Sequence, residues 1–399
     1  MSASIEIAQG YQFGSLHCGI KKESGKRDLT LIASDRPATA AGVYTQNLVC
    51  AAPVLLDRER TPGGSLRAIV VNSGVANACT GDRGMDDARK MGDLTGQALG
   101  VEGEQVLVMS TGIIGEFLPM DEIAGGVVKL APMLQSTEEA TIDAATGMMT
   151  TDTVHKLASR KIEIDGHTIR LTGMAKGAAM IGPNMATMLG LVVTDAALAP
   201  EDAQRLLLAA VEDTFNCISV DGHTSTNDTV LLMANGAAGG STLEGESLDL
   251  FAVALQEICE ELAKSIPSDG EGATHLITVD VSGCANKASA RKIAKTIADS
   301  PLVKTAVTGA DPNWGRIVSA AGYAGVPFAT DRVTLYVNGF LLYENGVPVA
   351  FDEGPVSVSI RDKRDTAIDI RFGDGDATAK FWTTDLTAEY VRLNADYRT

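Results

Sequence analysis

Strand-like and helix-like segments alternate along this chain from end to end. The apolar run at 67–74 precedes a helical pattern at 86–100, and the run at 105–112 precedes a second helical pattern at 120–134. The 399 residues are enough for two packed domains or one large domain, and a hydrophobic content of 45% is typical of a globular protein. The alternation therefore predicts an α/β protein.

The middle of the chain contains a hairpin, a strand and a helix. Period-two alternation over 161–171 flanks an Asp165-Gly166 pair, which predicts a tight hairpin turn and places Lys176 just beyond a strand. The run at 188–195 predicts a buried strand. Pro200 then begins a helix, because the first helical position needs no backbone amide.

The last third of the chain is richer in strand patterns. A helix at 248–266 and a strand at 275–283 lead into it. It contains an Asn338-Gly339 turn and two further expected strands, VSVSI at 356–360 and AIDIRF at 367–372. This shift in composition predicts a large α/β domain at 1–283 and a smaller domain at 284–399.

Charge and composition exclude several function classes. The formal net charge is −18, so the surface would repel nucleic acid. The six cysteines form no CxxC pair and have no histidine at ligand spacing, which argues against a metal site. The N-terminus has no signal-peptide pattern and no run could span a bilayer, so we expect a cytoplasmic protein that does not bind membranes.

One threonine stands out in the glycine-bearing apolar stretch MAKGAAMIGPNMATMLG at 174–190. Thr187 is flanked there by Met188 and Leu189. A hydroxyl in such surroundings is either a core threonine with a satisfied hydrogen bond or a nucleophile held where water is scarce. Taken alone, this stretch favours the core threonine.

The surrounding string, however, closely resembles the self-cleavage segment of the ornithine acetyltransferase family, the glutamate N-acetyltransferases of arginine biosynthesis. Further strings resemble that family in the same order and cover nearly the whole chain. They are STGIIGE (110–116), TTDT (150–153), VDGHTSTND (220–228), DGEGATHL (269–276), GADPNWGRI (309–317) and EYVRLNADYRT (389–399).

The resemblance implies a fold and a maturation step. The fold would be a layered α-β-β-α sandwich with a smaller α+β C-terminal domain. Thr187 would attack the carbonyl of Ala186, which would cut the protein into chains 1–186 and 187–399, and we expect two copies of each chain in the assembly. The freed α-amine has a reference pKa of about 7.7 to 8.0 and could act as the base for the hydroxyl on the same residue.

The resemblance also implies the reaction. Thr187 would take the acetyl group from N2-acetylornithine as an ester and pass it to L-glutamate, which predicts ping-pong kinetics. No metal or organic cofactor is required, and acetyl-CoA remains open as a second donor. Thr111 and Gly112 would stabilise the oxyanion. The substrate-binding residues would be Thr150, Lys176, Thr187, Glu271, Asn394 and Thr399.

Within that group, we expect Lys176 to contact a substrate carboxylate or amide and Glu271 to contact the ornithine ammonium. Asn227 and Asp228 match the family, and we expect them to have scaffold roles in turns and buried polar networks. Three positions depart from the family pattern as known to us, namely Val75, Ala179 and His223.

Two alternatives remain open at this point. The first is a self-cleaving amidase or aminopeptidase that uses the same threonine chemistry with water as the acceptor. The second is a non-catalytic amino-acid sensor that remains uncut and binds its ligand without acetyl exchange.

Overall fold

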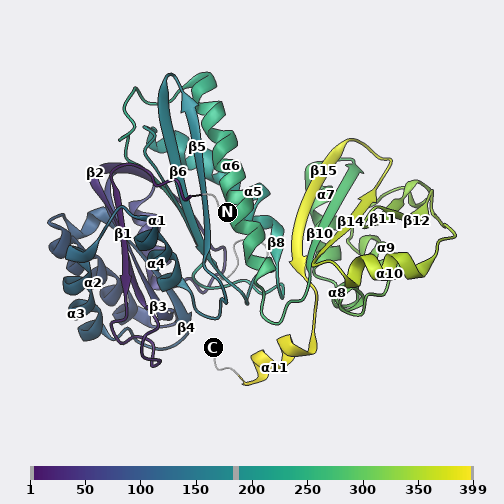
Figure 1. Cartoon of the computed structure of the whole chain (residues 1–399), viewed down its shortest axis with the longest axis horizontal. Coiled ribbons are helices and arrows are strands. Elements are labelled where there is room, and N and C mark those ends of the chain that lie inside the picture. The colour runs from purple at the N-terminus through teal and green to yellow at the C-terminus, as the bar shows by residue number, and fades with distance from the viewer. Residues whose placement is uncertain (1–3, 183–187, 397–399) are drawn as a thin grey trace.

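The computed structural model describes residues 4–182 and 188–396 (Figure 1). It contains two β-sheets and, within these residues, eleven α-helices. The mixed α/β class predicted from the sequence is confirmed. The four-layer arrangement of the large domain and the α+β character of the C-terminal part remain predictions.

The first sheet has the strand order β4-β3-β2-β9-β7-β6-β5, with β1 paired to β2. β3 and β4 run parallel, whereas β5, β6 and β7 are consecutive antiparallel neighbours. The parallel pair β7 and β9 lies between β2 and β6. The strands are β1 (Tyr11–Leu16), β2 (Leu29–Tyr44), β3 (Gly63–Val75), β4 (Val106–Ile113), β5 (Lys156–Ile164), β6 (His167–Lys176), β7 (Leu189–Thr194) and β9 (Thr229–Ala234).

The second sheet has the order β13-β12-β11-β14-β10-β15-β8. Its strands are β8 (Ile218–Ser219), β10 (Leu276–Cys284), β11 (Thr334–Val337), β12 (Phe340–Glu344), β13 (Val347–Pro348), β14 (Asp365–Arg371) and β15 (Ala377–Thr384). The division at residue 283 remains a prediction, and β10, the strand nearest to it, belongs to the second sheet.

Helices cover both sheets. In the first sheet, α1 and α2 contact β4, α3 contacts β1 and β2, α5 contacts β2 and β9, and α6 contacts β5 and β6. Helix α7 contacts β10 and β15 of the second sheet. The helices are α1 (Ala52–Arg60), α2 (Gly81–Leu99), α3 (Met120–Leu130), α4 (Glu138–Met148), α5 (Pro200–Asp213), α6 (Gly245–Ser268), α7 (Lys287–Ala298), α8 (Pro301–Thr308), α9 (Trp314–Gly322), α10 (Glu353–Arg361) and α11 (Ala388–Asp396).

Several local predictions are confirmed. Asp165 and Gly166 both have positive φ, as a two-residue hairpin turn requires, and Asn338 and Gly339 do the same between β11 and β12. Pro200 is the first residue of α5. Lys176 is the last residue of β6, whereas we had expected it just beyond the strand.

The strand predicted at 356–360 is wrong, because this segment lies in α10. The Asp352 side chain accepts a hydrogen bond from the backbone N–H of Gly354 and caps the helix. Val356 and Ile360 are buried and Val358 is exposed, so the burial follows a helical period. The alternating Val-Ser pattern is equally compatible with a strand, and the cap decides between the two.

The C-terminal helix α11 lies apart from the second sheet and runs beneath the loops of the first (Figure 1). Each of its residues is at least partly exposed. Among the described residues, no helix combines the length and apolar character needed to cross a membrane.

Candidate active site

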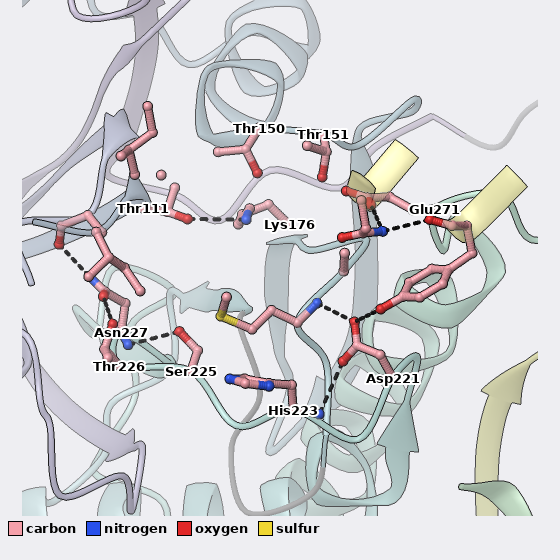
Figure 2. Close-up of a pocket in the computed structure, with 18 residues that line it drawn as sticks. Thr111, Thr150, Thr151, Lys176, Asp221, His223, Ser225, Thr226, Asn227 and Glu271 are labelled. Carbon is pink, nitrogen blue, oxygen red and sulfur yellow. Dashed lines mark hydrogen bonds between the residues drawn. The ribbon is translucent and has the colours of Figure 1, made fainter. Parts of the chain in front are cut away.

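A cavity of about 250 Å³ opens at the ends of several strands of the first sheet (Figure 2). Two of its residues, Thr111 and Gly112, lie close to the end of β4, and Lys176 is the last residue of β6. Distant parts of the sequence therefore converge here. The remaining described site residues on its wall are Thr150, Glu271 and Asn394.

Thr111 and Lys176 both line the cavity, and each is 2% exposed. Their side chains point toward each other (Figure 2). The Lys176 ammonium donates a hydrogen bond to Thr111 Oγ1 at 3.2 Å. Because this bond occupies a lone pair of the hydroxyl oxygen, the hydroxyl proton remains available to another acceptor. Such an arrangement suits a donor to an oxyanion.

Gly112 adopts a backbone conformation that excludes side chains. Its φ is +133°, and a Cβ atom there would lie 2.2 Å from the carbonyl carbon of Gly74. Gly74 and Gly112 are partners in the parallel register of β3 and β4. The two strands can therefore approach this closely only with glycine at position 112.

Asn227 ties the ends of the same two strands together. Its amide nitrogen donates to the carbonyl of Ala76 at 2.6 Å and to the carbonyl of Ser110 at 2.8 Å. Both carbonyls flank the Thr111 region, and all these contacts are buried. These bonds place Asn227 in a buried polar network, which fits the expected scaffold role.

The charge of Lys176 is balanced by buried carboxylates. Burial lowers the pKa of the Lys176 ammonium, and Asp152 acts in the opposite direction. Burial alone would raise the pKa of the Asp152 carboxyl, but Lys176, Lys156 and the Gly177 amide outweigh it and lower that pKa to about 2. Asp152 therefore remains an anion beside Lys176.

Helix α11 is docked onto the cavity rim. Asn394 Nδ2 donates to Glu271 Oε2 at 2.9 Å, and Tyr390 Oη donates to Asp221 Oδ2 at 3.2 Å (Figure 2). The Glu271 backbone N–H is held by the carbonyl of Ala178 at 2.9 Å. These contacts attach the C-terminal helix to segments of the site that precede it by more than 100 residues.

Ala186, Thr187 and Thr399 lie outside the described residues. The chain before that segment is held at Ile181, whose carbonyl accepts backbone hydrogen bonds from Val220, Asp221 and Gly222. The chain after it is held at Met188, whose N–H donates to Asp228 Oδ1 at 3.2 Å. This contact supports the scaffold role expected for Asp228, and burial raises the pKa of its carboxyl well above the usual range.

A second cavity of about 470 Å³ adjoins the first and shares Gly112, Thr150 and Glu271 with it. Three lysines from one loop, Lys21, Lys22 and Lys26, line this cavity together with the carboxylates of Glu23, Glu116, Asp152 and Glu271. The wall of the second cavity therefore carries charges of both signs.

The sequence model of the ArgJ family matches residues 12–399. The chain belongs to the ArgJ family. The arginine biosynthesis bifunctional protein ArgJ of Rhodopirellula baltica is 46% identical over 401 residues, which cover 100% of this chain and 98% of that protein. The protein of the same name from Geobacter sulfurreducens is 48% identical over 396 residues, which cover 98% and 99% of the two chains.

A solved member of the ArgJ family is similar in structure. The crystal structure of the arginine biosynthesis bifunctional protein argJ from Bacillus halodurans matches with a TM-score of 0.52 and 43% identity. The match covers 53% of this chain and 100% of the matched chain.

In this ArgJ family member, six of the predicted site residues meet around one cavity, and their chemical roles remain predictions. Asp152 and Asp221 lie in strings that resemble the family, but the sequence assigns them no role. Nor does the sequence mark Lys156 or Asp269 as contributors to the site. The Lys156–Asp269 ion pair joins residues 113 apart in sequence, so only the shared strings TTDT and DGEGA offer a signal for these residues. Of the three departures from the family pattern, Ala179 and His223 line the first cavity and Val75 lines the second.

Proposed function

We propose that this chain is a glutamate N-acetyltransferase of arginine biosynthesis, which transfers the acetyl group of N2-acetylornithine to L-glutamate. The observation that carries the proposal is the convergence of Thr111, Gly112, Lys176 and Glu271 on one amino-acid-sized cavity. Membership of the ArgJ family and relatives named arginine biosynthesis bifunctional protein support it.

The first half-reaction forms an ester. The Thr187 hydroxyl oxygen attacks the acetyl carbonyl while the α-amine of the same residue takes the hydroxyl proton. The Thr111 hydroxyl and the Gly112 amide would stabilise the oxyanion. When the intermediate collapses, the C–N bond breaks, the ornithine nitrogen takes the proton and ornithine leaves.

The second half-reaction reverses these steps with another amine. The α-amine of glutamate attacks the acetyl ester, the C–O bond breaks and Thr187 recovers its proton. Lys176 would pair with the substrate carboxylate in both halves, and Glu271 with the ornithine ammonium. This scheme needs no metal or organic cofactor.

We propose that the nucleophile arises by cleavage between Ala186 and Thr187. In support, Met180 lines the cavity, and the backbone N–H of Met188 donates a hydrogen bond to Asp228. The Bacillus halodurans match also spans 53% of this chain. Residues 187–399 make up the same share of the sequence.

The test follows ornithine release from N2-acetylornithine at increasing glutamate concentrations. We expect release that saturates with glutamate, equimolar N-acetylglutamate and parallel double-reciprocal plots. Release that is independent of glutamate would instead establish the amidase alternative. Uncut protein that binds ornithine without exchange would establish the sensor.

Acetyl-CoA is a second candidate donor, because relatives of this chain are named arginine biosynthesis bifunctional protein. The same assay with acetyl-CoA in place of N2-acetylornithine tests this.

We place the enzyme in the cytoplasm, as expected from the sequence, with two copies of each cleaved chain per assembly.

A further inference from the structure

Lys156 carries a buried charge close to the site but is not among the described residues that line either cavity. Its side chain, on β5, is 1% exposed. The ammonium nitrogen lies 2.7 Å from Asp152 Oδ1 and 2.7 Å from Asp269 Oδ2. One buried cation thus joins two carboxylates from different segments. Asp152 lies four residues from Lys156 in the sequence, and Asp269 lies 113 residues from it.

The Asp152 carboxylate in turn accepts hydrogen bonds from the backbone at two positions in the site. Its Oδ1 accepts a hydrogen bond of 2.6 Å from the backbone N–H of Gly177, the residue directly after Lys176. Its Oδ2 accepts a bond of 3.0 Å from the backbone N–H of Thr150. The positions of Thr150 and Lys176 therefore depend on a single carboxylate.

Asp269 restrains the segments that carry Thr150 and Glu271. It caps the C-terminus of α6 two residues before Glu271, and it accepts a 3.0 Å bond from the backbone N–H of Thr153. Glu271 is in turn fixed by its bond to the carbonyl of Ala178. The chain segments that carry Thr150, Lys176 and Glu271 all meet at the two carboxylates that Lys156 holds.

We propose that Lys156 is a positioning residue of the active site, which holds Asp152 and Asp269 and through them sets the spacing of Thr150, Lys176 and Glu271 for substrate binding. The inference rests on the proposed acetyltransferase function. Two buried carboxylates without their shared cation would repel each other, because a low-dielectric interior screens like charges poorly. Asp152 would then attract the Lys176 ammonium away from a substrate carboxylate.

The same charge acts on the titration of Lys176. The titratable groups that act on Lys176 come from several elements, so a pH profile reports on all of them. They are Asp152, Lys156, Asp228, Glu271 and Lys21. Removing the positive charge of Lys156 should raise the pKa of Lys176, since like charges lower the pKa of an ammonium.

The experiment compares Lys156→Met with Lys161→Met in the full-length enzyme. Lys161 is on the same strand but exposed, so the substitution is matched in chemistry and differs in burial. For Lys156→Met we expect KM for N2-acetylornithine to rise about tenfold to a hundredfold, with a smaller change in kcat. The alkaline limb of kcat/KM should also move to higher pH, a shift that general loss of packing would not cause.

Wild-type KM and an unmoved alkaline limb in a folded Lys156→Met enzyme would overturn the inference. If that variant does not fold, Asp269→Asn provides the second test, because it weakens one ion pair but keeps an acceptor oxygen. There we expect KM to rise about fivefold to tenfold, and an unchanged KM would overturn the inference. Failure of the proposed function is distinguishable, because then wild type and Lys161→Met would not transfer acetyl at all.

Discussion

At the scale of single residues, the bond from Lys176 to Thr111 leaves the threonine hydroxyl proton free for an oxyanion. We therefore expect Thr111→Val, which keeps the shape and removes the donor, to lower kcat about 10²- to 10³-fold. Thr111→Ser keeps the hydroxyl and serves as the matched control, with kcat close to wild type. Steady-state kinetics checks both variants, and a loss confined to KM in Thr111→Val would contradict the oxyanion role.

The pH profile is the second residue-scale prediction. Activity should rise with pH as the Thr187 α-amine loses its proton near its reference pKa of about 7.7 to 8.0. It should fall again as Lys176 loses its charge, at a pH below the usual range for lysine, because burial lowers the pKa of this ammonium. In Lys176→Arg the residual activity should lack this alkaline fall, since a guanidinium stays charged. An alkaline limb that is identical in both enzymes would show that another group titrates.

The sequence predicts which residues form the site better than it predicts how they are arranged. Thr111, Gly112, Lys176 and Glu271 could be singled out because they stand in strings that resemble a known family. The triad of Lys156, Asp152 and Asp269 could not, because its ion pairs form only when β5, the preceding loop and the end of α6 fold together. Nothing in the local sequence marks a lysine as buried.

At the scale of elements, α11 contributes to the site although only Tyr390 of its residues packs against the main hydrophobic core. It reaches the rim through Asn394 and Tyr390, and none of its residues is buried. Truncation after Leu386 should therefore raise KM for ornithine-bearing substrates about tenfold or more while the unfolding midpoint remains within a few degrees of wild type. Calorimetry and kinetics on the same sample check this, and an unchanged KM would remove α11 from the site.

Elements were predictable where local chemistry alone decides them. The Asp165-Gly166 hairpin and the start of α5 at Pro200 follow from backbone preferences of those residues. The segment at 356–360 is a helix where the sequence predicts a strand, because its alternating valines and serines fit both and the cap by Asp352 favours the helix. The docking of α11 depends on long-range contacts that no local pattern encodes.

At the scale of the whole molecule, the first sheet alternates between the two parts of the chain. β9 and β7, which follow residue 187, lie between β2 and β6, which precede it. Chains cut before Thr187 would share a hydrogen-bonded sheet and should separate only on unfolding. With a tag on the C-terminal chain, we expect both chains to co-elute in size exclusion at native pH and to separate in denaturant. Recovery of the tagged chain alone under native conditions would contradict this.

We propose that cleavage before Thr187 creates the residue that carries the acetyl group. Intact-mass spectrometry of the purified enzyme, incubated with N2-acetylornithine and no glutamate, tests both the cut and the acetyl-enzyme. We predict two masses, those of residues 1–186 and 187–399, with one acetyl group added to the second chain and lost when glutamate is supplied. In Thr187→Ala we predict one uncut, unmodified chain. A wild-type enzyme that transfers acetyl while uncut, or a cut enzyme that never carries the group, would contradict the account.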